Sequence, residues 1–261
     1  MYSFDLDRPV TLEAALAALK AEDAQPLGGG QTLIPALKQR LAAPSRLVSL
    51  AAIPDLCGID LEGETLTIGA ATPHAMVAGQ AGAYPALAAL AGGIGDPAVR
   101  NRGTIGGSLA NNDPSACYPA AVLGSGAVIC TNIREIAADD FFEGMFATAL
   151  EDGEIIIRVR FPVPQAACYR KFDHPASRFA LAGAFVARFP GSVRVAITGV
   201  SEEGVFRWSE AEAALSARFA PDALEGVSLP PEGMIEDLHG SSAYRAHLAG
   251  VMTRRAVAAM V

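Results

Sequence analysis

The chain has 261 residues, of which 51% are apolar and 18% are charged, and its formal net charge is −8. This length and apolar content supply a buried core and exclude a disordered chain. The acidic balance argues against nucleic acid and anionic membranes as partners, because both attract basic surfaces. No apolar run reaches the roughly 20 residues of a membrane span, and no signal peptide is visible, so we expect a cytoplasmic protein.

The amino-terminal segment alternates between helical and strand-like stretches. "TLEAALAALKAE" (11–22) predicts an amphipathic helix with Thr11 as its N-cap. A glycine-rich loop follows, and then come a helical turn at 34–41 and an apolar strand at 46–50. The pattern predicts a small α/β lobe over about residues 1–51.

Residues 52–162 predict a second and larger lobe. Its expected elements are strands at 61–70, 126–130 and 154–162, an alanine-rich helical stretch at 72–90 that Pro85 breaks, and an aromatic turn at 139–146. Two prolines, Pro162 and Pro164, then mark a boundary between domains.

The remaining residues, 168–261, predict a small C-terminal domain of antiparallel strands and helices. The strands are expected at 179–189, 192–200 and 204–208. "SSAYRAHLAGVMTRRAVAAM" (241–260) predicts the final helix, because serine caps begin it and apolar residues such as Leu248 and Met252 recur at helical spacing.

Two glycine-rich stretches are the strongest candidates for a binding site. They are "LGGGQTL" (27–33) and "RGTIGGSLANNDPSA" (102–116). Phosphate-binding loops use glycine because backbone N–H groups must reach the oxygens without a Cβ in the way. The first stretch alone is more typical of a tight turn, since it matches neither the P-loop nor the dinucleotide fingerprint. Two such loops with neutral Thr, Ser and Gln donors suit a pyrophosphate.

The inventory of reactive side chains predicts neither a metal site nor a catalytic residue. The cysteines and histidines are dispersed, without the spacing of a zinc site or an iron–sulfur cluster. No G-x-S-x-G motif supports hydrolase chemistry. His74 is interpreted as structural, because no second base or nucleophile accompanies it, and Arg254 and Arg255 complement the dipole of the final helix.

The two glycine-rich segments, read with their surroundings, resemble a known family. "GGGQTLIPALKQRLAAPSRLVSL" (28–50) and "VRNRGTIGGSLANNDPSACYPA" (99–120) are together similar to the FAD-binding medium subunit of molybdenum hydroxylases. That family comprises the carbon monoxide dehydrogenase and xanthine dehydrogenase type enzymes. The resemblance continues through 141–162, 169–187 and 237–257, and so covers nearly the whole chain in order.

The resemblance implies an α+β fold in two parts. A two-lobed FAD-binding domain of the vanillyl-alcohol-oxidase (PCMH) type would occupy 1–162, with lobes at about 1–51 and 52–162. A small α+β C-terminal domain with an antiparallel sheet and helices would follow at 168–261. The FAD would then lie between the two lobes.

The resemblance also implies which residues contact the FAD. They are Leu27, Gly28, Gly29, Gly30, Gln31, Thr32, Leu33, Ile94, Thr104, Gly106, Gly107, Ser108, Asn111, Asp113, Ile156, Tyr169 and Lys171. The two glycine segments would contact the pyrophosphate, whereas Ile94 would lie beside the flavin and Ile156 near the adenine. One position departs from the family: an aspartate often bonds the ribose where this chain has Cys117, and a thiol is a weak hydrogen-bonding group.

Residue types alone leave other roles open at four of these positions. Asp113 equally suits a turn, and Asn111 equally suits a left-handed backbone position. Lys171 taken by itself is typical of an exposed surface lysine, and Tyr169 equally suits packing at the domain junction.

The function implied by the resemblance is that of an FAD-binding electron-transfer subunit in a heterotrimer. A large molybdopterin subunit would pass electrons to [2Fe–2S] clusters of a small partner subunit, and these clusters would reduce the FAD. The FAD would then pass the electrons to an external acceptor. The complex would be a dimer of such heterotrimers. A self-contained FAD oxidase and a scaffold subunit without cofactor are the alternatives.

Overall fold

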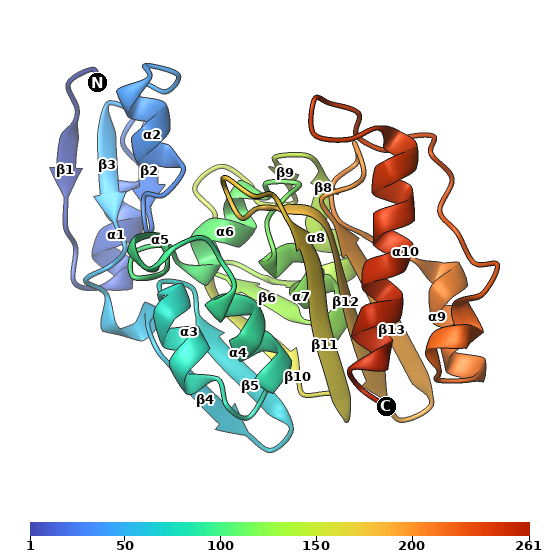
Figure 1. Ribbon diagram of the computed structural model, residues 1–261. Coiled ribbons are helices and arrows are strands. Elements are labelled where there is room, and N and C mark those ends of the chain that lie inside the picture. The colour runs from blue at the N-terminus through green and yellow to red at the C-terminus, as the bar shows by residue number, and fades with distance from the viewer.

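Three sheets succeed one another from the amino to the carboxyl end of the chain and lie side by side (Figure 1). The structure, a computed structural model, describes residues 1–261. The sheets have three, five and four strands, and a two-stranded hairpin completes the set. None of the helices has the length and apolar character of a membrane span.

The first sheet is parallel, with the strand order β1-β3-β2. Its elements are β1 (Asp5–Asp7), α1 (Leu12–Ala18), β2 (Ala24–Leu27), α2 (Leu33–Lys38) and β3 (Arg46–Ser49). Thr11 caps α1 as predicted, since its Oγ1 accepts from the backbone N–H of Ala14 at 3.2 Å. The predicted helix is too long at its carboxyl end. Ala15 of α1 packs in a small buried cluster with Val48 of β3.

The second sheet is antiparallel, with the strand order β4-β5-β10-β6-β7. Its strands are β4 (Ile59–Glu62), β5 (Thr65–Gly69), β6 (Val128–Thr131), β7 (Glu135–Ala137) and β10 (Ile156–Pro162). The helices between them are α3 (His74–Gln80), α4 (Pro85–Gly92), α5 (Pro97–Arg100), α6 (Ile105–Asn111), α7 (Tyr118–Ser125) and α8 (Ala138–Phe141). The hairpin of β8 (Phe142–Gly144) and β9 (Ala147–Thr148) follows α8.

Two of the sequence predictions for this lobe have different outcomes. The single strand predicted at 61–70 is wrong, because the chain forms the β4–β5 hairpin there. Gly63 lies between the two strands with a φ of +59°, a left-handed value that glycine adopts without strain. The helical stretch at 72–90 is divided as predicted, and Pro85 is the first residue of α4, where a missing N–H costs nothing.

The C-terminal sheet is antiparallel, as predicted, with the order β11-β12-β13-β14. Its elements are β11 (Ala166–Asp173), β12 (Ala180–Phe189), β13 (Ser192–Thr198), β14 (Phe206–Arg207), α9 (Ser209–Ala217) and α10 (Ser242–Ala258). The strand β12 is apolar from Ala180 to Ala187, where both of its faces are buried. Val186 packs in one cluster with Met252 of α10, and Phe185 packs in another with Ala121 of α7.

Candidate functional site

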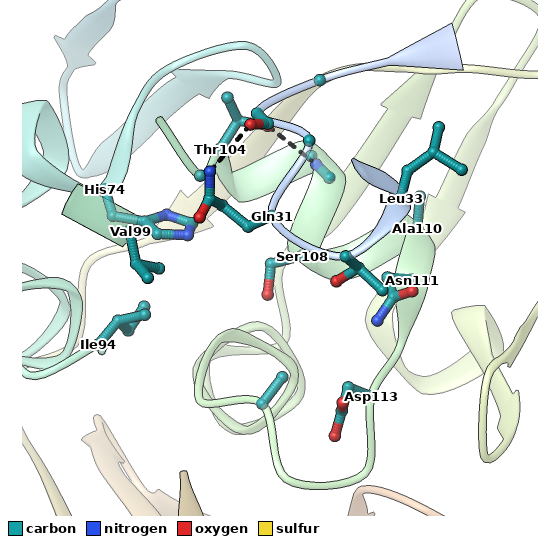
Figure 2. A pocket seen from close by; sticks show the side chains of 18 of the residues that line it. Gln31, Leu33, His74, Ile94, Val99, Thr104, Ser108, Ala110, Asn111 and Asp113 are labelled. Carbon is teal, nitrogen blue, oxygen red and sulfur yellow. Dashed lines mark hydrogen bonds between the residues drawn. The ribbon is translucent and has the colours of Figure 1, made fainter. Parts of the chain in front are cut away.

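A cleft of about 700 Å³ lies between the segment that follows β2 in the first sheet and the helices of the second sheet, with part of its wall from the segment between β11 and β12. This volume is in the usual range for cofactor pockets. Every residue that the resemblance implies in FAD contact lines the cleft, with the exception of Tyr169. Figure 2 shows Gln31, Thr104, Ser108 and Asn111 gathered around one part of the pocket.

The first glycine segment, which we define as Gly28–Leu33, presents free backbone donors. None of the N–H groups from Gly28 to Leu33 donates a hydrogen bond within the protein. Gly30 has a φ of +72°, so the turn requires glycine at that position. The three glycines and Leu33 are half-buried, and Thr32 and Leu33 begin α2, where N–H groups have no partner within the helix. A row of such donors in a cleft suits an anionic ligand.

The second glycine segment, which we define as Gly103–Ser108, has its backbone N–H donors engaged with the exception of that of Thr104. The N–H of Gly106 donates to the carbonyl of Ala70 at 2.9 Å, and the N–H of Gly107 donates to Thr104 Oγ1 at 3.2 Å. Thr104 thereby caps α6. A Cβ on Gly106 would lie 2.6 Å from that of Ala70, so glycine is needed here for close packing. This segment therefore contributes side chains, rather than backbone donors, to the cleft.

The two glycine segments are in direct contact. A Cβ on Gly29 would overlap the carbonyl oxygen of Arg102 and would lie 2.5 Å from the Cα of Gly103. A Cβ on Gly28 would lie 2.9 Å from Thr104 Oγ1. The glycines at 28 and 29 therefore allow the second segment to support the first one.

Polar residues at the carboxyl end of α6 divide into free and engaged side chains. The side chain of Asn111 makes no hydrogen bond within the protein, whereas that of Asn112 donates to the carbonyls of Gly144 and Ala147. Asp113 accepts from the N–H of Ser115 at 2.8 Å, as a turn residue does, and burial raises the pKa of its carboxyl. Asn111 and Asp113 both line the cleft, and Asn111 has a free amide.

Two charged residues on the cleft wall are saturated by protein partners. The buried carboxylate of Glu154 accepts from Arg134 at 2.9 Å and from Thr131 at 2.7 Å, and the hydrogen bonds from Arg134 are the main reason that its pKa falls to about 2. Lys171 Nζ donates to the carbonyl of Gly93 at 2.9 Å and to that of Arg178 at 2.7 Å. It also pairs with Asp173 at 2.9 Å, so the three ammonium protons of Lys171 are engaged.

Tyr169 lies behind the cleft wall rather than in it. Its ring packs against Phe185 with a centroid separation of 6.3 Å, and burial raises the pKa of its hydroxyl. The ring packs against the buried cluster of the second sheet, and the hydroxyl has no hydrogen-bond partner in the protein. Cys117 does line the cleft, but it is almost fully buried, and that burial raises the pKa of its thiol. The thiol is therefore neutral at physiological pH.

Sequence reasoning missed one residue that lines the cleft and one that supports its wall. His74 lines it, although its isolated position in the sequence predicts a structural role. Arg100 holds the wall beside it, because its Nη1 donates to the carbonyls of Ile94 at 2.9 Å and Gly95 at 3.0 Å. No sequence signal predicts either contact, because the partners of Arg100 are backbone carbonyls and those of His74 are distant in the chain.

The cleft beside the first sheet and its row of free N–H groups are features that suit a phosphate-bearing cofactor. Comparison with known proteins specifies the class. The family model described as "FAD binding domain in molybdopterin dehydrogenase" matches residues 2–164. The chain therefore belongs to the family of FAD-binding domains of molybdopterin dehydrogenases, and the predicted resemblance is confirmed.

Individual relatives match nearly the full length of the chain. It is 34% identical to the carbon monoxide dehydrogenase medium chain of Afipia carboxidovorans, over 98% of this chain and 96% of that protein. It is 31% identical to the nicotine 6-hydroxylase medium subunit of Paenarthrobacter nicotinovorans, over 95% and 94%. The relatives are subunits of dehydrogenases and hydroxylases, which confirms the predicted class of FAD-dependent oxidoreductase subunit.

A solved structure confirms the fold class. The carbon monoxide dehydrogenase of Hydrogenophaga pseudoflava that lacks the Mo-pyranopterin moiety superimposes with a TM-score of 0.87 at 33% sequence identity. The superposition covers 99% of this chain and 97% of the matched chain. The C-terminal sheet, which lies outside the family model, is therefore shared as well.

Proposed function

We propose that this chain is the FAD-bearing electron-transfer subunit of a heterotrimeric molybdenum-dependent dehydrogenase or hydroxylase. It takes electrons from iron–sulfur clusters of a small partner subunit and passes them to an external acceptor. The observation that carries this proposal is the row of free N–H groups at Gly28–Leu33, in a cleft that holds no paired nucleophile and base. A flavin supplies redox chemistry itself, so the protein needs only to bind, orient and shield it.

Each part of the cleft suits one part of the cofactor. The free N–H groups of Gly28–Leu33 would hold the pyrophosphate oxygens, with the unpartnered side chains of Ser108 and Asn111 as further donors. The apolar side chain of Ile94 would lie against the flavin, and Ile156 would lie near the adenine. The ammonium protons of Lys171 are engaged within the protein, so Lys171 would hold the cleft wall in place rather than donate a hydrogen bond to the cofactor.

The partners follow from the relatives' names and from this chain's own composition. Medium chain and medium subunit are the names of one component among several. A large molybdopterin subunit and a small iron–sulfur subunit are the components that we propose, assembled as a dimer of heterotrimers. The dispersed cysteines of this chain agree with iron–sulfur clusters in a different subunit.

Purification of the chain together with its partner subunits tests this function. We expect one FAD per copy of this chain, released on denaturation, and a flavin that becomes reduced through the clusters and is reoxidised by an external acceptor. Adding NAD, a quinone and oxygen one at a time to the reduced complex identifies that acceptor. A flavin that an organic substrate reduces in the isolated chain would instead favour the oxidase, and a colourless complex would favour the scaffold.

A further inference from the structure

His74 is held at the cleft by backbone contacts with the second glycine segment. It is the first residue of α3, and its N–H donates to the carbonyl of Gly103 at 2.9 Å. The preceding residue, Pro73, forms an isolated bridge with Thr104. Figure 2 shows the imidazole on the same side of the pocket as Val99 and Ile94, and all of these side chains line the cleft.

The imidazole of His74 is buried, yet the protein uses neither of its nitrogens. The residue is 5% exposed, and its Nδ1 is enclosed without a hydrogen-bond partner. No hydrogen bond engages Nε2 either, and the ring is held by packing alone, against the backbone of Gly103 and 5.2 Å from the ring of Tyr118. Buried polar groups are normally paired, so a ring with two idle nitrogens at a ligand cleft points to a partner outside the chain.

His74 carries no charge at physiological pH. Burial, reinforced by the positive charge of Arg100, lowers the pKa of the imidazole to about 4. A neutral imidazole has one N–H donor and one acceptor nitrogen. We assign the proton to Nε2, because an enclosed N–H without a partner is rarer in protein interiors than an enclosed acceptor, and Nδ1 is the enclosed nitrogen.

We propose that His74 is a further cofactor-binding residue, whose Nε2–H donates to an oxygen of the polyol chain between the pyrophosphate and the ring of FAD. This inference rests on the function proposed above. Its place in the cleft supports it, because Figure 2 shows the imidazole beside Gln31 of the first glycine segment on one side and beside Val99 and Ile94 on the other. The first glycine segment would hold the phosphates, and the apolar pair of Val99 and Ile94 would contact the flavin ring. The polyol oxygens would then lie beside the imidazole.

The substitution His74→Phe tests this inference by removing both nitrogens while keeping an aromatic ring. We expect the Kd of FAD for the full chain to rise about tenfold, the factor that corresponds to 1.4 kcal/mol, as for the loss of one hydrogen bond. The Kd of ADP should not change, because ADP lacks the polyol chain. His74→Gln, which returns an amide donor, should bring the FAD affinity back to within about threefold of the wild type.

Tyr118→Phe is the matched control. Its buried hydroxyl also lacks a partner and lies beside His74, but Tyr118 does not line the cleft, so the affinity for FAD should not change. Unchanged FAD affinity in His74→Phe would overturn the inference, as would an equal weakening of FAD and ADP. If His74→Phe does not fold, a loss of FAD affinity in Gly103→Ala, whose Cβ would displace the ring, supports the inference and an unchanged affinity overturns it. Failure of the wild-type chain to bind FAD would contradict the proposed function instead.

Discussion

The two glycine segments are similar in sequence but have different roles in the structure. In Gly28–Leu33 the backbone N–H groups are free, whereas in Gly103–Ser108 those of Gly106 and Gly107 are bound to the protein. The glycines of the second segment allow it to pack on Ala70, and those of the first allow it to lie on the second. A glycine-rich stretch beside a cleft is therefore either the donor surface or its support, and hydrogen-bond partners tell the two apart.

The substitution Gly29→Val should produce the largest effect, because it separates the two segments. The added side chain overlaps the backbone of Arg102, so the first segment must move and its donors lose their alignment. We expect FAD affinity to fall about a thousandfold, as for the loss of two charge-assisted hydrogen bonds of about 2 kcal/mol each. Equilibrium titration with FAD measures this change. Gly79→Ala in α3, where a Cβ meets nothing, is the control, and equal FAD affinity in both variants would contradict the distinction.

Acid should act on the second segment and not on the first, because the titrating group, His74, packs on Gly103. Its pKa is 6.5 in the unfolded chain and about 4 in the folded one, so the unfolded state binds more protons between these values. The free energy of unfolding should therefore fall as the pH drops from 6.5 to 4, by about 3 kcal/mol from this group. Denaturant unfolding of the cofactor-free chain across this range, compared with His74→Phe, measures the contribution. Parallel pH profiles for the two proteins would show that His74 is not the group responsible.

A Cβ added to the second glycine segment should lower the stability of the fold more than it lowers the affinity for FAD. Gly106→Ala places its methyl group against Ala70, and we expect the free energy of unfolding to fall by about 1–2 kcal/mol. FAD affinity of the folded variant should stay within about threefold of the wild type, because the donors of the first segment remain in place. The double variant with Ala70→Gly should recover part of the loss. An affinity loss as large as that of Gly29→Val would mean that the two segments are not distinct in function.

Removal of the Ser108 hydroxyl should have the smallest effect. This hydroxyl lines the cleft and has no partner in the protein, so Ser108→Ala should leave the thermal stability of the cofactor-free chain unchanged. FAD affinity should fall about threefold, as for one neutral hydrogen bond. Calorimetric titration measures both the affinity and its enthalpy. An unchanged affinity would leave Asn111 as the side-chain donor of α6 to the cofactor.

The long alternating strands and the final helix could be predicted from the sequence, because each carries a local period. The helix α7 could not be predicted, because it is buried on every side and its sequence has no amphipathic period. The helix α6 contains two adjacent glycines, which are poor helix formers, and it depends on the Thr104 cap and on packing against Ala70. Local propensity predicts elements best where packing does not override it.

The candidate site could be predicted only in part, and for a related reason. The two glycine segments lie far apart in the sequence, and only their resemblance to a family brought them together before the structure did. Lys171 was predicted at the cleft, but the engagement of its protons by backbone carbonyls leaves no trace in residue types. His74 has its neighbours at Gly103 and Tyr118, so its role depends on tertiary contacts that no local pattern encodes.

The segment Gly93–Gly95 has three consecutive carbonyls that each accept from a cationic side chain. Lys171 holds the first, and Arg100 holds the other two. This part of the wall has therefore already lost its conformational freedom before any cofactor arrives, and the entropy of ordering it belongs to folding rather than to binding. Association with FAD should thus proceed in a single kinetic phase at this wall, and the slow ordering of a loop should not limit its rate.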